Sequence, residues 1–134
     1  MSAVLVDSNV ILDVMSEDEA WFAWSSEALE RLGGEARLVV NAMIYAEVST
    51  RFTRIEDLDS ALPRSLFERE PIPFEAAFLA GKAHLAYRRR GGGRLSTLPD
   101  FIIGAHAAVA GHRLLTRDAA RYRTYFPKLT LIAP

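Results

Sequence analysis

The chain has 134 residues, a formal net charge of −1, half of its residues hydrophobic and a quarter charged. This composition is typical of one globular domain and excludes an extensively disordered chain. Cysteine is absent, which excludes disulfides, thiolate metal sites and cysteine nucleophiles. No apolar run reaches membrane-spanning length and no signal-peptide core precedes Asp7. We expect a single domain over residues 1–134, located in the cytoplasm and without a membrane partner.

Short, apolar, partly β-branched runs alternate along the chain with stretches in which apolar residues recur at helical spacing. Glycines predict the ends of three helices, and a proline is expected to interrupt a fourth. In chain order we expect a strand at 3–6, helices from residue 10 and over 17–32, a strand at 37–41, helices over 42–52 and 55–67, at best an edge strand at 70–73, helices over 74–90 and 96–111, a strand at 112–116, a short helix over 117–126 and a strand at 129–133.

Strands that alternate with helices predict an α/β fold, because parallel strands need helical crossovers that cover both faces of the sheet. We therefore expect a single-domain three-layer α/β/α sandwich with a mostly parallel central sheet of four to five strands. In such sheets ligands bind beyond the carboxyl ends of the strands, where the strand order reverses. Polar residues that follow the strands are thus the first candidates for a site.

Four acids stand near such positions. Asp7 directly follows the first strand, and Asp118 comes shortly after the strand that contains Leu114 and Leu115. If these two strands flank the reversal point, both carboxylates face the same crevice. The other two acids lie on helices: Glu47 follows the second strand, and Asp100 is in the first turn of a mainly apolar helix.

Each acid also has an ordinary structural interpretation. Asp7 and Asp118 could be helix N-caps, whose side chains accept backbone N–H bonds. Asp100 could belong to a capping box that Thr97 begins, and the remaining acid could pair with Arg51, four residues further along its helix. Caps, however, need not all lie at one end of one sheet.

A gathered set of carboxylates has a physical consequence. Neighbouring carboxylates raise each other's pKa values, so such a cluster is poorly stable without a cation. With oxygen ligands and no sulfur, the cation should be hard, which favours Mg²⁺ or Mn²⁺ over zinc.

The segments that contain these acids resemble, in order, the four acidic motifs of PIN-domain ribonucleases: VLVDSNVILD, NAMIYAEV, TLPDFIIGAHA and LLTRDAARY. The similarity is closest to the small VapC-like toxins of type II toxin–antitoxin systems and covers nearly the whole chain. It implies a PIN-like fold and an endoribonuclease that uses Mg²⁺ (or Mn²⁺) to hydrolyse RNA phosphodiester bonds and, as a toxin, inhibits translation.

The resemblance implies a catalytic site made of Asp7, Glu47, Asp100 and Asp118. We expect Asp7, Asp100 and Asp118 to contact the metal, and Glu47 to act through a metal-bound water. Asn9 and Thr116 are expected to orient the carboxylates. For Asn9, a hydrogen bond that only stabilises the turn is an equal alternative.

Partners follow from the same resemblance and from the basic residues. Arg88, Arg89, Arg90 and Arg94 are candidates for binding the RNA backbone, although such clusters are also typical of solvated helix ends. VapC-like toxins imply a cognate antitoxin and a homodimer. An exposed Phe22 would be compatible with an apolar surface for the antitoxin. The three histidines fit no metal-ligand spacing, and we assign them no role: His84, His106 and His112.

Other functions on a similar sheet fit the residues less well. A response-regulator receiver would need adjacent acids after the first strand, and a haloacid-dehalogenase-like phosphatase would need a second Asp at position 9, which is Asn. The remaining alternative is a catalytically silent PIN-fold domain that binds RNA or protein and regulates. Metal-dependent RNA cleavage that is lost with Asp7→Asn would discriminate between the enzyme and this domain.

Overall fold

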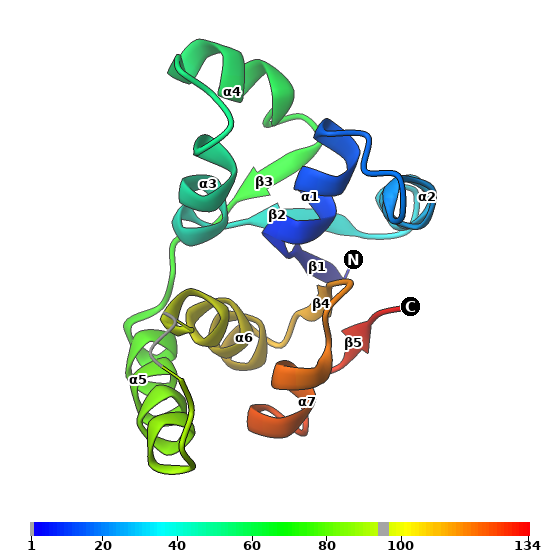
Figure 1. Ribbon diagram of the computed structural model, residues 1–134. Coiled ribbons are helices and arrows are strands. Elements are labelled where there is room, and N and C mark those ends of the chain that lie inside the picture. Colours follow the sequence, from blue (N-terminus) through cyan, green and yellow to red (C-terminus); the bar gives the residue numbers. More distant parts are fainter. Residues whose placement is uncertain (1, 94–96) are drawn as a thin grey trace.

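The computed structural model describes residues 2–93 and 97–134, which form one five-stranded sheet with helices on both faces (Figure 1). All strand pairs are parallel, and the order across the sheet is β3-β2-β1-β4-β5. The elements in chain order are β1 (Ala3–Val6), α1 (Ser8–Met15), α2 (Phe22–Gly33), β2 (Arg37–Val40), α3 (Ala42–Ser49), α4 (Ile55–Ala61), β3 (Phe67–Arg69), α5 (Phe74–Arg89), α6 (Leu98–Ala110), β4 (Arg113–Leu115), α7 (Ala120–Tyr125) and β5 (Leu131–Ile132).

The expected α/β sandwich is therefore confirmed, and the sheet is parallel throughout. Strand β1 lies in the centre, and all four of its residues are buried. Helices α1 to α4 cover one face, and α5 to α7 cover the other (Figure 1). Right-handed crossovers explain this division, because the chain first moves from β1 toward β3 and later returns to β4 on the opposite side of β1.

The strand order reverses at β1, between its neighbours β2 and β4. The pairing of Val6 with Leu115 brings the ends of β1 and β4 level. The hydrogen bond from the Asp7 N–H to the Leu115 carbonyl, with an N···O distance of 2.9 Å, continues this ladder by one residue. Residues just after β1 and β4 therefore meet at the place where ligands bind in open parallel sheets.

Prolines account for two differences from the predicted elements. The edge strand expected at 70–73 is wrong: β3 is Phe67–Arg69, and only Glu70 continues the pairing, through its N–H to the Val40 carbonyl. Pro71 follows at once and has no N–H to donate. The helix expected over 55–67 is interrupted near Pro63, as predicted, and ends at Ala61 because the residue that precedes a proline disfavours helical geometry; the difference is that it does not resume after Pro63.

The start of α2 is later than expected because Asp18 holds a turn there. Its Oδ1 accepts hydrogen bonds from the backbone N–H groups of Ala20 and Trp21, both at 2.9 Å. The helix then begins at Phe22, which is 38% exposed, as expected. Trp24 is half-buried and packs against the core.

The largest apolar side chains of helix α5 face the solvent, although an apolar stripe usually faces the core. Phe74 and Phe78 are 90% and 69% exposed, whereas the buried residues of the helix are alanines, Ala76, Ala80 and Ala83. Small side chains on this face allow α5 to approach α6 closely, and the larger apolar side chains remain at the surface. No helix in the described part of the chain combines the length and apolarity needed to cross a membrane.

Gly104 of α6 permits the close approach of α7. A Cβ atom at this position would lie 2.7 Å from a ring carbon of Phe126 and 2.9 Å from one of Tyr122. Both rings are buried, so neither moves aside freely. Gly81 in α5 offers a contrast, because a Cβ there would meet nothing within 4 Å.

We predict that Gly104→Ala lowers the free energy of unfolding by about 1–3 kcal/mol, because the added methyl group overpacks the α6–α7 contact. Gly81→Ala should instead raise it by up to about 1 kcal/mol, since alanine is the better helix former and the space is open. Urea denaturation of both variants checks this pair. A Gly104→Ala protein as stable as Gly81→Ala would contradict the packing described here.

Candidate acidic site at the carboxyl ends of β1 and β4

Asp7 occupies the backbone N-cap position of α1, but its side chain does not cap the helix. The carboxylate is buried, with 2% of the residue exposed, and Oδ2 accepts two hydrogen bonds. The Thr116 hydroxyl donates one at 2.9 Å, and the Tyr122 hydroxyl donates the other at 2.8 Å. The N-cap interpretation of this side chain is therefore wrong.

The other three acids also make contacts different from the capping and pairing alternatives. Glu47 Oε1 accepts a hydrogen bond from the Ser8 hydroxyl at 2.8 Å, and no ion pair joins it to Arg51 in the described residues. Asp100 contacts Arg121, with a distance of 2.5 Å between Oδ2 and the guanidinium. Asp118 is exposed, and the helix that follows it has Ala119 at its N-cap.

Thr116 connects these elements. Its hydroxyl donates to Asp7 and accepts from the Asn9 side-chain amide at 3.1 Å and from the Asp118 backbone N–H at 3.2 Å. The Asn9 Oδ1 in turn faces the Arg117 N–H at 3.4 Å. Thr116 and Asn9 thus fix the end of β4 against the start of α1, the arrangement that our prediction of orienting roles requires.

Burial and like charge together raise the pKa of Asp7, Glu47 and Asp100. Burial raises the pKa of Asp7 from 3.8 to about 6, opposed by the hydrogen bonds from Tyr122 and Thr116 and reinforced by Asp100 and Glu47. Burial likewise raises the pKa of Glu47 and of Asp100, and a neighbouring acid adds to each shift. Asp7, Glu47 and Asp100 are therefore electrostatically coupled, and Asp118 contributes to the shift of Asp100.

The donor set of this site consists of oxygen atoms, the kind that Mg²⁺ and Mn²⁺ prefer. The four carboxylates are not crowded together. Among the described residues, three possible ligand atoms lie within 4.8 Å of one another in a different cluster, which consists of Glu70, His106 and His112. A cation would offset the burial that chiefly raises the pKa of Asp7, and would reduce the repulsion from Asp100 and Glu47 that adds to it. The residues thus fit a hard divalent ion in charge and donor type.

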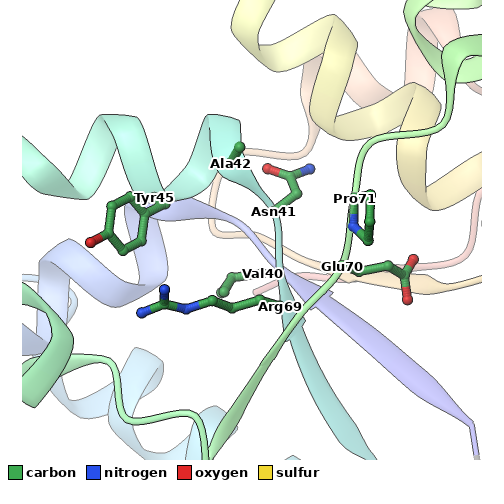
Figure 2. Close-up of a pocket in the computed structure, with 7 residues that line it drawn as sticks. All are labelled: Val40, Asn41, Ala42, Tyr45, Arg69, Glu70 and Pro71. Carbon is green, nitrogen blue, oxygen red and sulfur yellow. The ribbon is translucent and has the colours of Figure 1, made fainter.

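The second cluster joins Glu70 to two histidines that sequence reasoning left without a role. Nε2 of His106 and Nε2 of His112 each lie 2.8 Å from Glu70 Oε1. These hydrogen bonds lower the pKa of Glu70, although its burial alone would raise it. Figure 2 shows the Glu70 side chain directed away from Tyr45 and Arg69, which line a pocket of about 310 Å³ that contains none of the four acids.

The neighbouring Asn41 determines how His106 bonds. Asn41 Oδ1 accepts the Ile44 N–H at 2.9 Å, so its amide nitrogen is the group that faces His106 Nδ1, also at 2.9 Å. Nδ1 is then an acceptor, and the ring hydrogen lies on Nε2, which donates to Glu70. This nitrogen has no lone pair free for a metal, so we interpret the cluster as a hydrogen-bond network.

The side chain of Arg117 is held by α1 and by Trp21, which precedes α2. Its Nε contacts both carboxylate oxygens of buried Asp13, at 3.1 and 2.8 Å, and Ser25 donates to the same carboxylate at 2.8 Å. The guanidinium also lies 5.6 Å from the centre of the Trp21 ring. Because Arg117 stands between Thr116 and Asp118, these contacts fix the loop that carries both.

Sequence reasoning missed Tyr122, Ser8 and the pairing of Arg121. Tyr122 is an aromatic residue on a short helix, and nothing in its spacing distinguishes it from a core residue. Of the predicted RNA-binding arginines, Arg88 and Arg89 are exposed at the end of α5, Arg90 lies 5.5 Å above the Tyr125 ring, and Arg94 lies outside the described residues.

Comparison with known proteins identifies the family. The PIN domain matches residues 4–127, and the chain belongs to this family. Similar solved structures include VapBC2 from Rickettsia felis bound to a DNA fragment from its promoter (TM-score 0.74, 17% identity, 98% of each chain covered) and VapBC-1 from nontypeable Haemophilus influenzae (TM-score 0.72, 18% identity, 98% and 97% covered). A toxin–antitoxin complex from Klebsiella pneumoniae has a TM-score of 0.69 and 21% identity, with 96% and 95% covered. No curated protein matches the chain in sequence.

The raised pKa of Asp7 predicts that Asp7→Asn stabilises the fold in the presence of a chelator. An acid whose folded pKa lies above its unfolded value loses stability as the pH rises from about 4 through 6. The difference between 3.8 and about 6 corresponds to about 3 kcal/mol at pH 7.5. The variant should gain up to about this amount there and little at pH 4, as measured by urea denaturation.

Exposed Glu27 on α2 provides the control, because Glu27→Gln removes a carboxylate that makes no contact with the site. This variant should keep the pH profile of the wild type. An Asp7→Asn protein that is less stable than the wild type at pH 7.5 would contradict the electrostatic description of the site.

Proposed function

We propose that this chain is a Mg²⁺- or Mn²⁺-dependent endoribonuclease and the toxin of a toxin–antitoxin pair that inhibits translation. The observation that carries the proposal is the buried Asp7 carboxylate at the reversal point of the sheet, electrostatically coupled to Glu47 and Asp100. Membership of the PIN domain family supports a nuclease, and the resemblance to VapC-like toxins supports RNA as the substrate. We also propose that the protein acts in the cytoplasm, where RNA is translated.

In this proposal Asp7, Asp100 and Asp118 hold the cation, and Glu47 acts through a bound water. A divalent ion held there supplies activation of water and stabilisation of charge on the phosphate oxygens. The hydroxyls of Thr116 and Tyr122 both bond Oδ2 of Asp7, which fixes the rotamer of the carboxylate. Ser8 holds Glu47 in the same way from the first turn of α1.

We further propose that Arg88, Arg89, Arg90 and Arg94 contribute to binding of the RNA backbone. Arg88 and Arg89 are exposed, and a guanidinium that neutralises a phosphate makes affinity depend on salt. Replacement of Arg88 and Arg89 by alanine should weaken RNA binding and flatten its salt dependence. An unchanged affinity would contradict this part of the proposal.

Cleavage of a mixed RNA pool tests the proposed activity. Purified protein should cut the RNA with Mg²⁺ or Mn²⁺ and not with EDTA. Asp7→Asn, Asp100→Asn and Asp118→Asn should each lower the rate by about 100-fold or more, because each removes charge that the cation needs. Asp57→Asn, which replaces an exposed acid in the first turn of α4, should retain activity.

Wild-type protein that is folded, free of any copurified partner and inactive on the RNA pool with either metal would contradict the proposed activity. Such a result would favour the alternative of a silent PIN-fold domain that binds RNA or protein. Equal activity of the wild type and the three Asp variants would instead point to a contaminating nuclease.

We propose a cognate antitoxin and a second copy of the chain as protein partners. The similar structure from Klebsiella pneumoniae is a toxin–antitoxin complex, which supports the first. The apolar side chains that α5 exposes, Phe74 and Phe78, offer a surface for the second.

Phe74→Ser together with Phe78→Ser should convert a dimer into a monomer in analytical ultracentrifugation, because the substitutions remove exposed apolar surface and leave the buried alanine face of α5 intact. Phe22→Ser, at an exposed position on the opposite face of the sheet, is the control and should leave the dimer unchanged. A wild type that is monomeric at micromolar concentration would contradict the dimer.

A further inference from the structure

Arg121 has an unusual position among the basic residues of the chain. Among the arginines and lysines that the structure describes, Arg121 is the one that forms an ion pair with one of the four acids, and its partner atom is Asp100 Oδ2. Arg117, its neighbour in sequence, is instead committed to Asp13. The Arg121 guanidinium also lies 5.5 Å from the centre of the Tyr87 ring, so α5 and α6 both contact it.

Stability does not explain this ion pair. The side chains of Arg121 and Asp100 are 36% and 37% exposed, and ion pairs with such exposure contribute little to folding. The pKa of Asp100 also remains raised: its burial outweighs the attraction of Arg121. The guanidinium is thus a partly exposed cation at the edge of an acidic site, attached to it by a contact that adds little to the stability of the fold.

A divalent cation and Arg121 compete for the same carboxylate. An ion held by Asp100 would draw the electron density of Oδ2 and weaken its attraction for the guanidinium. The released group would keep its place beside Tyr87, next to the acids, where it could bind another anion. A guanidinium binds phosphate oxygens well because its N–H groups match their spacing.

We infer that Arg121 is a substrate-binding residue that contacts the RNA phosphate next to the four acids and exchanges Asp100 for this phosphate when a divalent cation is held there. This inference rests on the proposed function and adds to it a residue that the four acidic motifs do not assign to the substrate. The carboxylates cannot themselves attract a phosphate, and Arg121 supplies the positive charge at their edge.

A second arginine–tyrosine pair adjoins the first. Arg90 lies over Tyr125 at 5.5 Å, and the Tyr87 and Tyr125 rings are in edge contact at 6.0 Å. Cations interleaved with aromatic rings are typical of surfaces that bind single-stranded nucleic acid. The two pairs therefore define a path for the RNA from Arg121 along the ends of α5 and α7.

Opposite effects on two affinities distinguish this role from a structural one. Arg121→Gln should raise the affinity for Mn²⁺ in the absence of RNA by about 2- to 10-fold, because a competing cation is removed. The same variant should lower the affinity for a fluorescent single-stranded RNA of mixed sequence by about 10-fold. The number of phosphate contacts derived from the salt dependence of this affinity should fall by about one. Calorimetry measures the first, and fluorescence anisotropy, with Ca²⁺ in place of Mg²⁺ to limit cleavage, measures the second.

Arg123→Gln is the matched control, since Arg123 is exposed on the same helix and makes no ion pair in the described structure. It should leave Mn²⁺ affinity unchanged and alter RNA affinity less than Arg121→Gln does. A fall in both affinities for Arg121→Gln would indicate a structural role, and an unchanged RNA affinity would exclude the phosphate contact; either result overturns the inference. Wild-type protein that binds Mn²⁺ but not RNA would instead contradict the proposed function itself, and the inference with it.

Discussion

The site depends on a carboxylate that the fold takes out of water. Asp7 follows a fully buried central strand, so its side chain enters a region where ionisation is unfavourable, and its pKa rises to about 6. Two hydroxyls compensate for part of this cost, from Thr116 at the end of β4 and from Tyr122 on α7. The rest of the cost persists at neutral pH and is the free energy that a bound cation can recover.

Much of the surrounding structure holds the donors of these two hydrogen bonds in place. Asp13 and Asn9 of α1 fix Arg117 and Thr116, and therefore the loop after β4. Gly104 allows α7 to lie close enough to α6 for Tyr122 to reach Asp7. Core packing and site geometry thus depend on the same contacts, and a substitution at Gly104 is expected to affect both.

The sequence predicts the fold class, and the places of Asp7 and Asp118, because strand ends are marked by local signals: an apolar run followed by polar residues. Glu47 and Asp100 lie on helices and are singled out by the resemblance to PIN-domain ribonucleases. It does not predict contacts between distant helices. The hydrogen bond from Tyr122 to Asp7 and the pairing of Arg121 with Asp100 depend on how α7 packs against α6. Similarly, the apolar pattern of α5 indicates a helix but not that its alanine face, rather than Phe74 and Phe78, faces inward. The roles of the four acids and of Asn9 and Thr116 stay predictions.

The most direct measurement is the pKa of the Asp7 carboxyl by carbon-13 NMR, with and without Mg²⁺. A value near 6 without the metal, together with a marked decrease at saturating Mg²⁺, is the result expected for a buried carboxylate that holds a cation. A value near 3.8 that does not respond to Mg²⁺ would contradict the account. The Asp7 carboxylate would then neither carry an unfavourable charge nor bind the cation.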